Sequence, residues 1–166
     1  MDTACNPAVW SSFFSAEVGA SAGLVGLLFV AVSINLAQII AMRLLVARAA
    51  KALFTLGGVL IASILCMVPG QPLTALGVEL AAWGFLIWVA TTRAEYFASH
   101  GNAFIGKKER VLQVVVTQMS SLPLMAGGIS LLVRSGGGLY WLVAGSVFSF
   151  IAALIDAWVL LIEIQR

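Results

Sequence analysis

Five long apolar runs, separated by short polar breaks, account for most of the chain. They cover residues 13–40, 52–68, 73–92, 111–133 and 139–164. A helix that crosses a lipid bilayer needs about 20 predominantly apolar residues. Only 10% of the residues are charged, whereas about 25% is typical of a soluble domain. The sequence therefore predicts an all-α membrane protein, a polytopic bundle of five transmembrane helices in a single domain over residues 1–166.

The breaks between the runs contain residues that end helices. Residues 69–72 read PGQP, and residues 134–138 read RSGGG. Proline lacks the backbone donor that a continuing helix requires, and such dipeptides mark turns. The second run is the shortest, so we expect its helix to begin earlier and to include Arg48 and Lys51. Their long side chains would carry the charges to the membrane surface.

The basic residues are divided unequally between the two sides that five spans create. One side holds Arg134 alone, and the other holds Arg43, Arg48, Lys51, Arg93, Lys107, Lys108, Arg110 and Arg166. Because cytoplasmic loops are rich in Lys and Arg, this division predicts an N-terminus outside and a C-terminus inside. The loop cations are expected to contact anionic headgroups of the lipid bilayer. The cluster is too small, and too close to the membrane, to predict nucleic-acid binding.

The first run carries polar residues at helical spacing. Positions that are 18 apart return to the same face of an α-helix, as Glu17 and Asn35 do. The stripe that they define contains Glu17, Ser21, Leu24, Leu28, Asn35 and Gln38. Unpaired polar groups are costly in hydrocarbon, so the stripe is expected to face other helices or the water of a pore. In the alternative interpretation, the two amides bond neighbouring helices and Glu17 lies in the outer headgroup layer.

Small residues in the same run predict close helix packing. Gly19 and Gly23 are four positions apart, as are Ala22 and Gly26. This spacing lets a second backbone approach closely in a membrane, either within one chain or between chains. Gly145 in the fifth run is expected to serve the same purpose.

The remaining polar residues in the runs are candidates for an ionisable site. Glu79 is expected at a depth similar to that of Glu17, so the two acids could form an outer cation or proton site. Asp156 is the most deeply placed acid, and such a residue is either functional or paired for structural reasons. Gln118 and Asn35 are both possible partners for it. Pro123 interrupts the fourth run and predicts a kink, with a gating hinge as the functional alternative.

The sequence offers no catalytic or metal-binding motif. Cys5 and Cys66 both fall toward the outer face, where an oxidising compartment would permit a disulfide, but spacing does not decide whether they pair. Neither belongs to a metal-binding pattern. We therefore expect no metal, no cofactor and no enzymatic activity, because hydrolase, zinc-protease and phosphate-loop motifs are missing from the sequence.

Several segments together resemble a family of small bacterial integral membrane proteins, often actinobacterial, some of which are labelled "modulator of FtsH protease". The segments are GASAGLVGLLFVAVSINL, RAAKAL, VPGQ followed by LGVEL, and GGGLYWLVAGSVFSFIAALIDAWVLLIEI. The resemblance covers nearly the whole chain and implies a location in the bacterial cytoplasmic (inner) membrane. It implies no chemistry, and it draws attention to Glu17, Asn35, Arg48, Gln71 and Glu79.

Two classes of function fit these patterns. The first is a homo-oligomeric channel or permeation protein, whose pore between subunits is lined by the first run and narrowed by Leu24 and Leu28. The second is a non-conducting accessory or regulatory subunit of a larger membrane complex or membrane protease, which binds its partner through glycine-rich helix faces. A proton-coupled transporter is less favoured, because the chain shows no inverted repeat.

Overall fold

Every regular element in the described part of the chain is a helix. The computed structural model describes residues 3–100 and 107–164. Its elements in chain order are η1 (Thr3–Cys5), η2 (Pro7–Trp10), α1 (Ser11–Ile34), α2 (Leu36–Ala41), α3 (Arg43–Cys66), α4 (Leu73–His100), α5 (Lys107–Val133) and α6 (Tyr140–Ile164). Five of these helical segments are long and apolar enough to cross a membrane. The prediction of an all-α fold with five such helices is therefore confirmed.

Two helices extend well beyond their apolar runs. α3 begins at Arg43, so Arg48 and Lys51 lie inside it. α4 continues to His100, eight residues past the end of its run. The segment RAEYFASH holds neither glycine nor proline, so nothing in it opposes helix continuation. Glu95 consequently lies on a helix instead of in a loop.

The first span is interrupted near its end. α1 stops at Ile34, and Asn35 occupies its C-cap with φ of −107° and ψ of 20°. The side-chain Nδ2 of Asn35 donates a 3.0 Å hydrogen bond to the carbonyl oxygen of Ala31. This bond gives the last turn of α1 a side-chain donor in addition to its backbone ones. The short helix α2 then leads to Met42, the single residue before α3.

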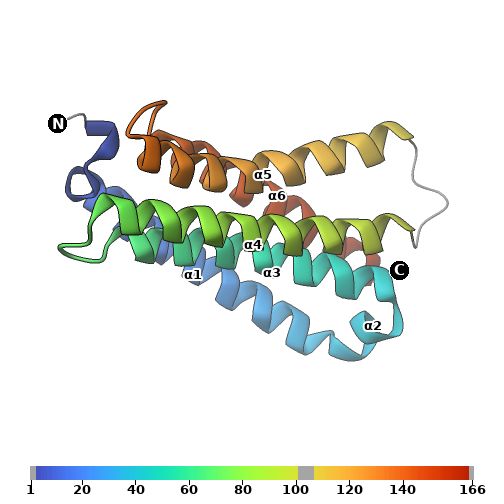
Figure 1. Ribbon diagram of the computed structural model, residues 1–166. Coiled ribbons are helices and arrows are strands. Elements are labelled where there is room, and N and C mark those ends of the chain that lie inside the picture. Colours follow the sequence, from blue (N-terminus) through green and yellow to red (C-terminus); the bar gives the residue numbers. More distant parts are fainter. Residues whose placement is uncertain (1–2, 101–106, 165–166) are drawn as a thin grey trace.

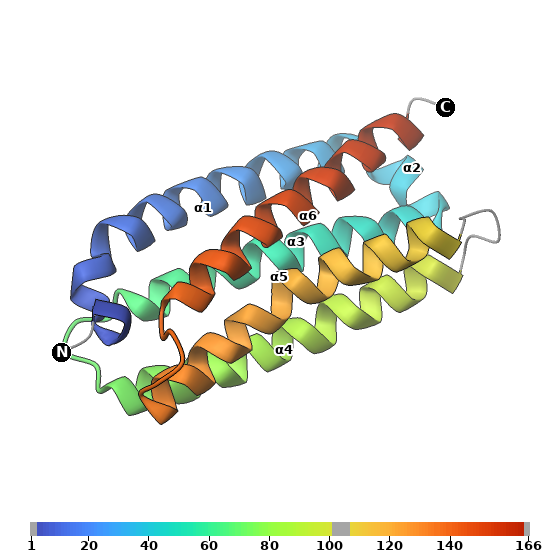
Figure 2. The same cartoon turned by 90° about the horizontal axis from the view of Figure 1, so that it is seen from above.

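α3 lies at the centre of the bundle. It packs against α1, α4 and α6, while α5 packs against α4 and α6. Figures 1 and 2 show the long helices side by side, with the beginning of the described chain and the end of α6 at opposite ends of the bundle. Of the five spans, α1 is the least buried and α3 the most. α1 is therefore a peripheral helix of the single chain.

α4 and α5 approach each other most closely, and glycines make this possible. A Cβ atom on Gly128 would lie 2.3 Å from the backbone nitrogen of Ala81. One on Gly84 would lie 2.6 Å from the backbone nitrogen of Met125, and one on Gly77 would lie 2.9 Å from Leu132. These distances leave no room for a side chain, so the two backbones are in direct contact.

The N-terminal turn packs on the connection between α5 and α6. Gly138 has a φ of +53°, and a Cβ atom there would also lie 2.2 Å from the carbonyl oxygen of Ala4. The same carbonyl accepts a 2.8 Å hydrogen bond from the backbone nitrogen of Leu139. Position 138 therefore requires glycine for two reasons: the backbone has a positive φ, and there is no room for a Cβ atom. The contact holds η1 against the connection between α5 and α6.

Candidate functional site

A buried acid links three helices at the end of the bundle that contains η1. Glu17 of α1 is 6% exposed, and its Oε2 accepts a 2.5 Å hydrogen bond from the Ser63 hydroxyl of α3. The carboxyl group also lies near Ser146 on α6, whose hydroxyl donates a 2.7 Å hydrogen bond to the carbonyl oxygen of Leu142. The Ser21 hydroxyl, one turn along α1, donates 2.6 Å to the carbonyl oxygen of Glu17. The polar groups of this region are therefore satisfied within the chain, as burial requires.

Glu79 does not join this cluster. Its side chain is exposed, and its Oε2 accepts a 2.5 Å hydrogen bond from Nε2 of Gln71. Glu17 is buried and bonded to serine instead. The expected outer site built from both acids is not present in the structure.

A second buried cluster contains charged residues from three helices. The Nζ of Lys51 on α3 lies 2.6 Å from Oε2 of Glu95 on α4 and 3.0 Å from Oδ2 of Asp156 on α6. Each of the three residues is at most 6% exposed. The Thr117 hydroxyl of α5 shares its one proton between the carbonyl oxygen of Gln113, at 2.9 Å, and Oε2 of Glu95, at 3.3 Å. Four helices thus meet at one ammonium and two carboxylates.

Arg48 adds a second cation to this cluster. It precedes Lys51 by about one helical turn, is 6% exposed, and acts electrostatically on Asp156. Among the described residues, the Nε of Arg48 has no hydrogen-bond partner. Within the same residues, Oδ2 of Asp156 accepts no well-aligned hydrogen bond, although the Lys51 ammonium is close to it. The two cations balance Glu95 and Asp156. The prediction that Arg48 and Lys51 reach the membrane surface is wrong, because buried carboxylates hold Lys51 inside the bundle.

The sequence patterns missed this cluster because Glu95 appeared to lie in a loop. The signal that could have revealed it is the uninterrupted helix-forming segment after Arg93. Neither of the expected partners meets Asp156. The amide of Gln118 instead accepts a 2.7 Å hydrogen bond from the Trp88 indole and donates 3.4 Å to the Thr92 hydroxyl. Asn35 bonds its own helix.

Buried hydroxyl groups lie between the two clusters. The Ser149 hydroxyl of α6 donates 3.1 Å to the carbonyl oxygen of Ser120 on α5. The hydroxyls of Ser120 and Ser121 donate to the carbonyl oxygen of Thr117, at 2.8 Å and 3.0 Å. We call the whole set the polar seam. It contains Glu17, Ser63, Ser146, Ser149, Ser120, Ser121, Thr117, Glu95, Lys51 and Asp156, and none of them is more than 6% exposed.

Pro123 lies next to the seam without interrupting α5. Proline lacks a backbone donor, so it leaves the carbonyl oxygen of Met119 without its usual partner. The hydroxyls of Ser120 and Ser121 donate to the carbonyl oxygen of Thr117 and not to that of Met119. A Cβ atom on Gly145 would lie 3.4 Å from the Cβ of Pro123, which is an ordinary contact distance, so α6 packs against this turn without a strict need for glycine.

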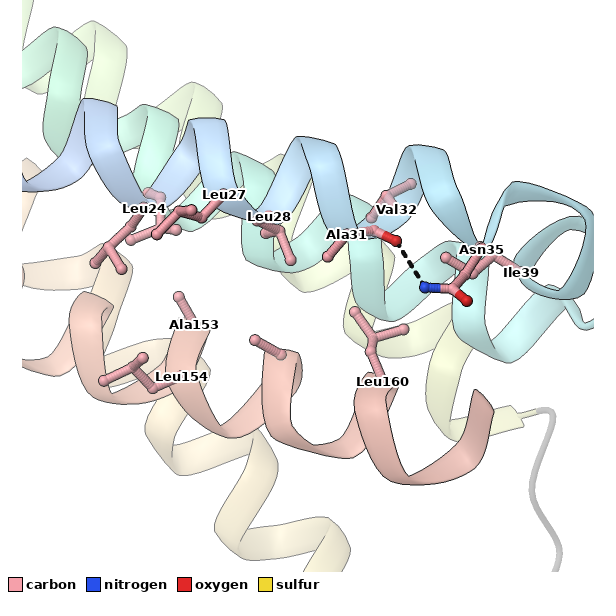
Figure 3. Close-up of a pocket in the computed structure, with 12 residues that line it drawn as sticks. Leu24, Leu27, Leu28, Ala31, Val32, Asn35, Ile39, Ala153, Leu154 and Leu160 are labelled. Atoms are coloured by element: carbon pink, nitrogen blue, oxygen red, sulfur yellow. Dashed lines mark hydrogen bonds between the residues drawn. The ribbon is translucent and has the colours of Figure 1, made fainter. Parts of the chain in front are cut away.

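The rest of the first-span stripe lies along an apolar groove between α1 and α6. Leu24 and Leu28 face Ala153 and Leu160 across a groove of about 210 Å³, and Asn35 lies at one end of it (Figure 3). Gln38 lies on α2 and is exposed. Glu17, Ser21 and Leu28 are buried within the single chain. They are therefore not available to line a pore between subunits.

The glycines of α1 do not pack within the chain either. Gly19, Gly23 and Gly26 have open space where a Cβ atom would stand. The close contacts were found instead at Gly77, Gly84 and Gly128, described above. Gly77 and Gly84 are seven positions apart on α4 and Gly128 lies on α5, so a search for small residues four apart did not find them.

The two cysteines are free thiols in the structure. Cys66 is buried in the apolar cluster around Phe14 and Leu142, and the partly exposed Cys5 packs against the same cluster. No protein-family model, curated protein or solved structure matches this chain.

Proposed function

We propose that the chain is a multi-pass protein of the bacterial inner membrane that conducts protons along the polar seam. This proposal keeps the permeation class that the sequence favours, but it moves the pathway from an interface between subunits into the core of one subunit. The observation that carries it is the Lys51 ammonium held between two buried carboxylates, with further buried hydroxyl groups on α3, α5 and α6 between this cluster and Glu17. Ionisable groups inside a membrane span are costly and mark ion or proton pathways.

The chemistry of the seam suits protons. Carboxyl and ammonium groups gain and lose protons, and a hydroxyl group can accept one hydrogen bond while it donates another. Ser146 and Asp156 are ten residues apart on α6, which corresponds to about 15 Å along the helix. Serine and threonine hydroxyls occupy the intervening core. The seam is too well buried to admit hydrated ions without a rearrangement.

The orientation of the pathway follows from the cations outside the core. With Arg48 and Lys51 buried, the loop ends still carry Arg43, Arg93 and Lys108 on one side and Arg134 on the other. Arg166 lies outside the described residues. By the positive-inside rule, the Glu17 end faces outward and the Asp156 end faces the cytoplasm. Protons would enter at Glu17 and leave near Asp156, or the reverse.

The test is proton flux into proteoliposomes that contain a trapped pH-sensitive dye, driven by a potassium gradient with valinomycin. We expect wild-type protein to acidify the vesicles and both Asp156→Asn and Glu17→Gln to reduce the rate by at least about tenfold, since a side chain positioned to give or take a proton contributes about 10²–10⁴-fold to a reaction step that transfers one. Glu79→Gln is the matched control, because Glu79 is exposed and bonded only to Gln71 among the described residues. Wild-type flux no greater than that of empty vesicles, or equal effects of the three variants, would exclude the proposal.

A second candidate function is supported by a different observation. Gly19, Gly23 and Gly26 form an unoccupied small-residue face on α1, and such faces support helix association in lipid. An accessory subunit would use this face to bind a second copy or a partner membrane protein. The association is measured as the mass of the detergent-solubilised complex. Gly23→Leu should then abolish the association, while Glu17→Gln should leave it unchanged. If Gly23→Leu keeps the wild-type mass, the face is not an interface.

A further inference from the structure

A second groove lies between α3 and α4, at the end of the bundle where α3 begins. Its volume is about 450 Å³, within the range of about 300–1,000 Å³ that is usual for small-molecule sites. Half-buried alanines, including Ala47 and Ala50, form part of its lining, and the exposed rings of Phe54 and Phe97 stand along it. The groove is open along one side. Because α3 and α4 are spans, that side faces lipid.

Two arginines stand at this groove. Arg43 is the first residue of α3, and Arg93 lies on α4; both side chains are exposed. Within residues 3–100 and 107–164, neither guanidinium makes a hydrogen bond or an ion pair. In contrast, Lys51 on the same helix is neutralised by buried carboxylates. The groove therefore combines an apolar channel with two uncompensated positive charges.

We propose that this groove binds an anionic phospholipid. The phosphate lies between the guanidinium groups of Arg43 and Arg93, which suit phosphate because each presents several N–H donors in a planar fork. One acyl chain follows the alanine floor toward Phe54, which is eleven residues from Arg43 and thus about 16 Å along the helix. A zwitterionic lipid carries its own cation and gains less from the two arginines. Basic pockets between spans on the cytoplasmic side are suited to anionic headgroups in this way. The inference is independent of proton conduction.

The experiment is native mass spectrometry of the detergent-solubilised protein, titrated with phosphatidylglycerol or phosphatidylcholine of identical acyl chains. We expect wild-type protein to bind phosphatidylglycerol at least about tenfold more tightly, since charge-assisted hydrogen bonds to phosphate are the strong ones. The double variant Arg43→Gln/Arg93→Gln should lose this preference. Arg134→Gln is the matched control, an exposed arginine in the connection after α5, and it should keep the preference.

A further variant tests the position of the acyl chain. Ala50→Phe fills the groove but leaves both arginines, so it should weaken phosphatidylglycerol binding by about tenfold, while millimolar inorganic phosphate should not displace the lipid. Helix content by circular dichroism confirms that each variant is folded. Equal affinity of wild-type protein for the two lipids, retention of the preference in the double variant, or displacement by inorganic phosphate would each overturn the proposal. Unchanged binding in Ala50→Phe would also overturn it.

Discussion

Replacement of Lys51 by methionine should strongly destabilise the bundle. The substitution keeps an unbranched side chain of similar length but removes the ammonium that lies 2.6 Å from Glu95 and 3.0 Å from Asp156. Both carboxylates would stay buried, with Thr117 as the remaining donor to Glu95. Loss of one partner of a buried ion pair costs about 3–5 kcal/mol. Because Arg48 remains as a second cation near Asp156, we expect a loss within that range and not above it.

A quadruple variant separates the charge from the packing. Lys51→Met and Arg48→Met combined with Glu95→Met and Asp156→Leu replace all four charged groups by apolar side chains of roughly similar size. Such replacements of buried ionic groups are often neutral or stabilising, so we expect the quadruple variant to recover most of the loss. It should nevertheless show no proton flux, because the seam then lacks its inner ionisable groups.

The free energy of unfolding can be measured by titrating the protein in mixed micelles with dodecyl sulfate and following helix content by circular dichroism. Substitutions without a specific mechanism change stability by no more than about 0.5 kcal/mol. If Lys51→Met lies within that margin of wild type, then the ammonium does not neutralise the buried carboxylates. If the quadruple variant is as unstable as the single one, the loss reflects packing and not charge.

Three further outcomes follow from the packing. Gly128→Ala should lower the free energy of unfolding by about 1–3 kcal/mol in the same titration, because its Cβ atom would lie 2.3 Å from backbone. Gly23→Ala should be neutral or slightly stabilising. Equal losses in the two variants would contradict the α4–α5 contact. Phe14→Ala should cost about 3–5 kcal/mol because Phe14 is fully buried, and a loss below about 1 kcal/mol would contradict that burial. A membrane-impermeant maleimide should label Cys5 in intact cells much faster than Cys66, which is 4% exposed; equal rates would show that the outer end of the bundle is open.

The number and type of the helices could be predicted because they depend on local sequence. Runs of apolar residues and proline or glycine breaks determine where a helix crosses lipid, and no contact between helices is needed for that inference. The end of α4 was the exception. Its last residues are polar enough to look like a loop, although Glu95 is helical because its carboxylate meets Lys51 inside the bundle.

The partners of the polar residues could not be predicted in the same way. Helical spacing shows which residues share one face of one helix, but the rotation of that helix against its neighbours depends on packing between distant segments. The sequence places Glu17 and Glu79 at a similar depth in the membrane. In the structure Glu17 is buried and bonded to a serine, whereas Glu79 is exposed. Asp156 was recognised as a candidate, but its neighbour Lys51 was assigned to the membrane surface. A long lysine side chain can either extend to the surface or stay inside the bundle, and the sequence does not decide between the two.

The backbone contact between α4 and α5 limits how this molecule can change shape. Two helices that touch through Gly77, Gly84 and Gly128 cannot slide or separate without breaking many contacts at once, so they should rock as one rigid body. α1 and α6 both pack on α3 and leave an apolar groove between themselves. Any opening motion is therefore expected at that side, by a swing of α1 about the break at Asn35, and water would reach Glu17 and the serines beside it first.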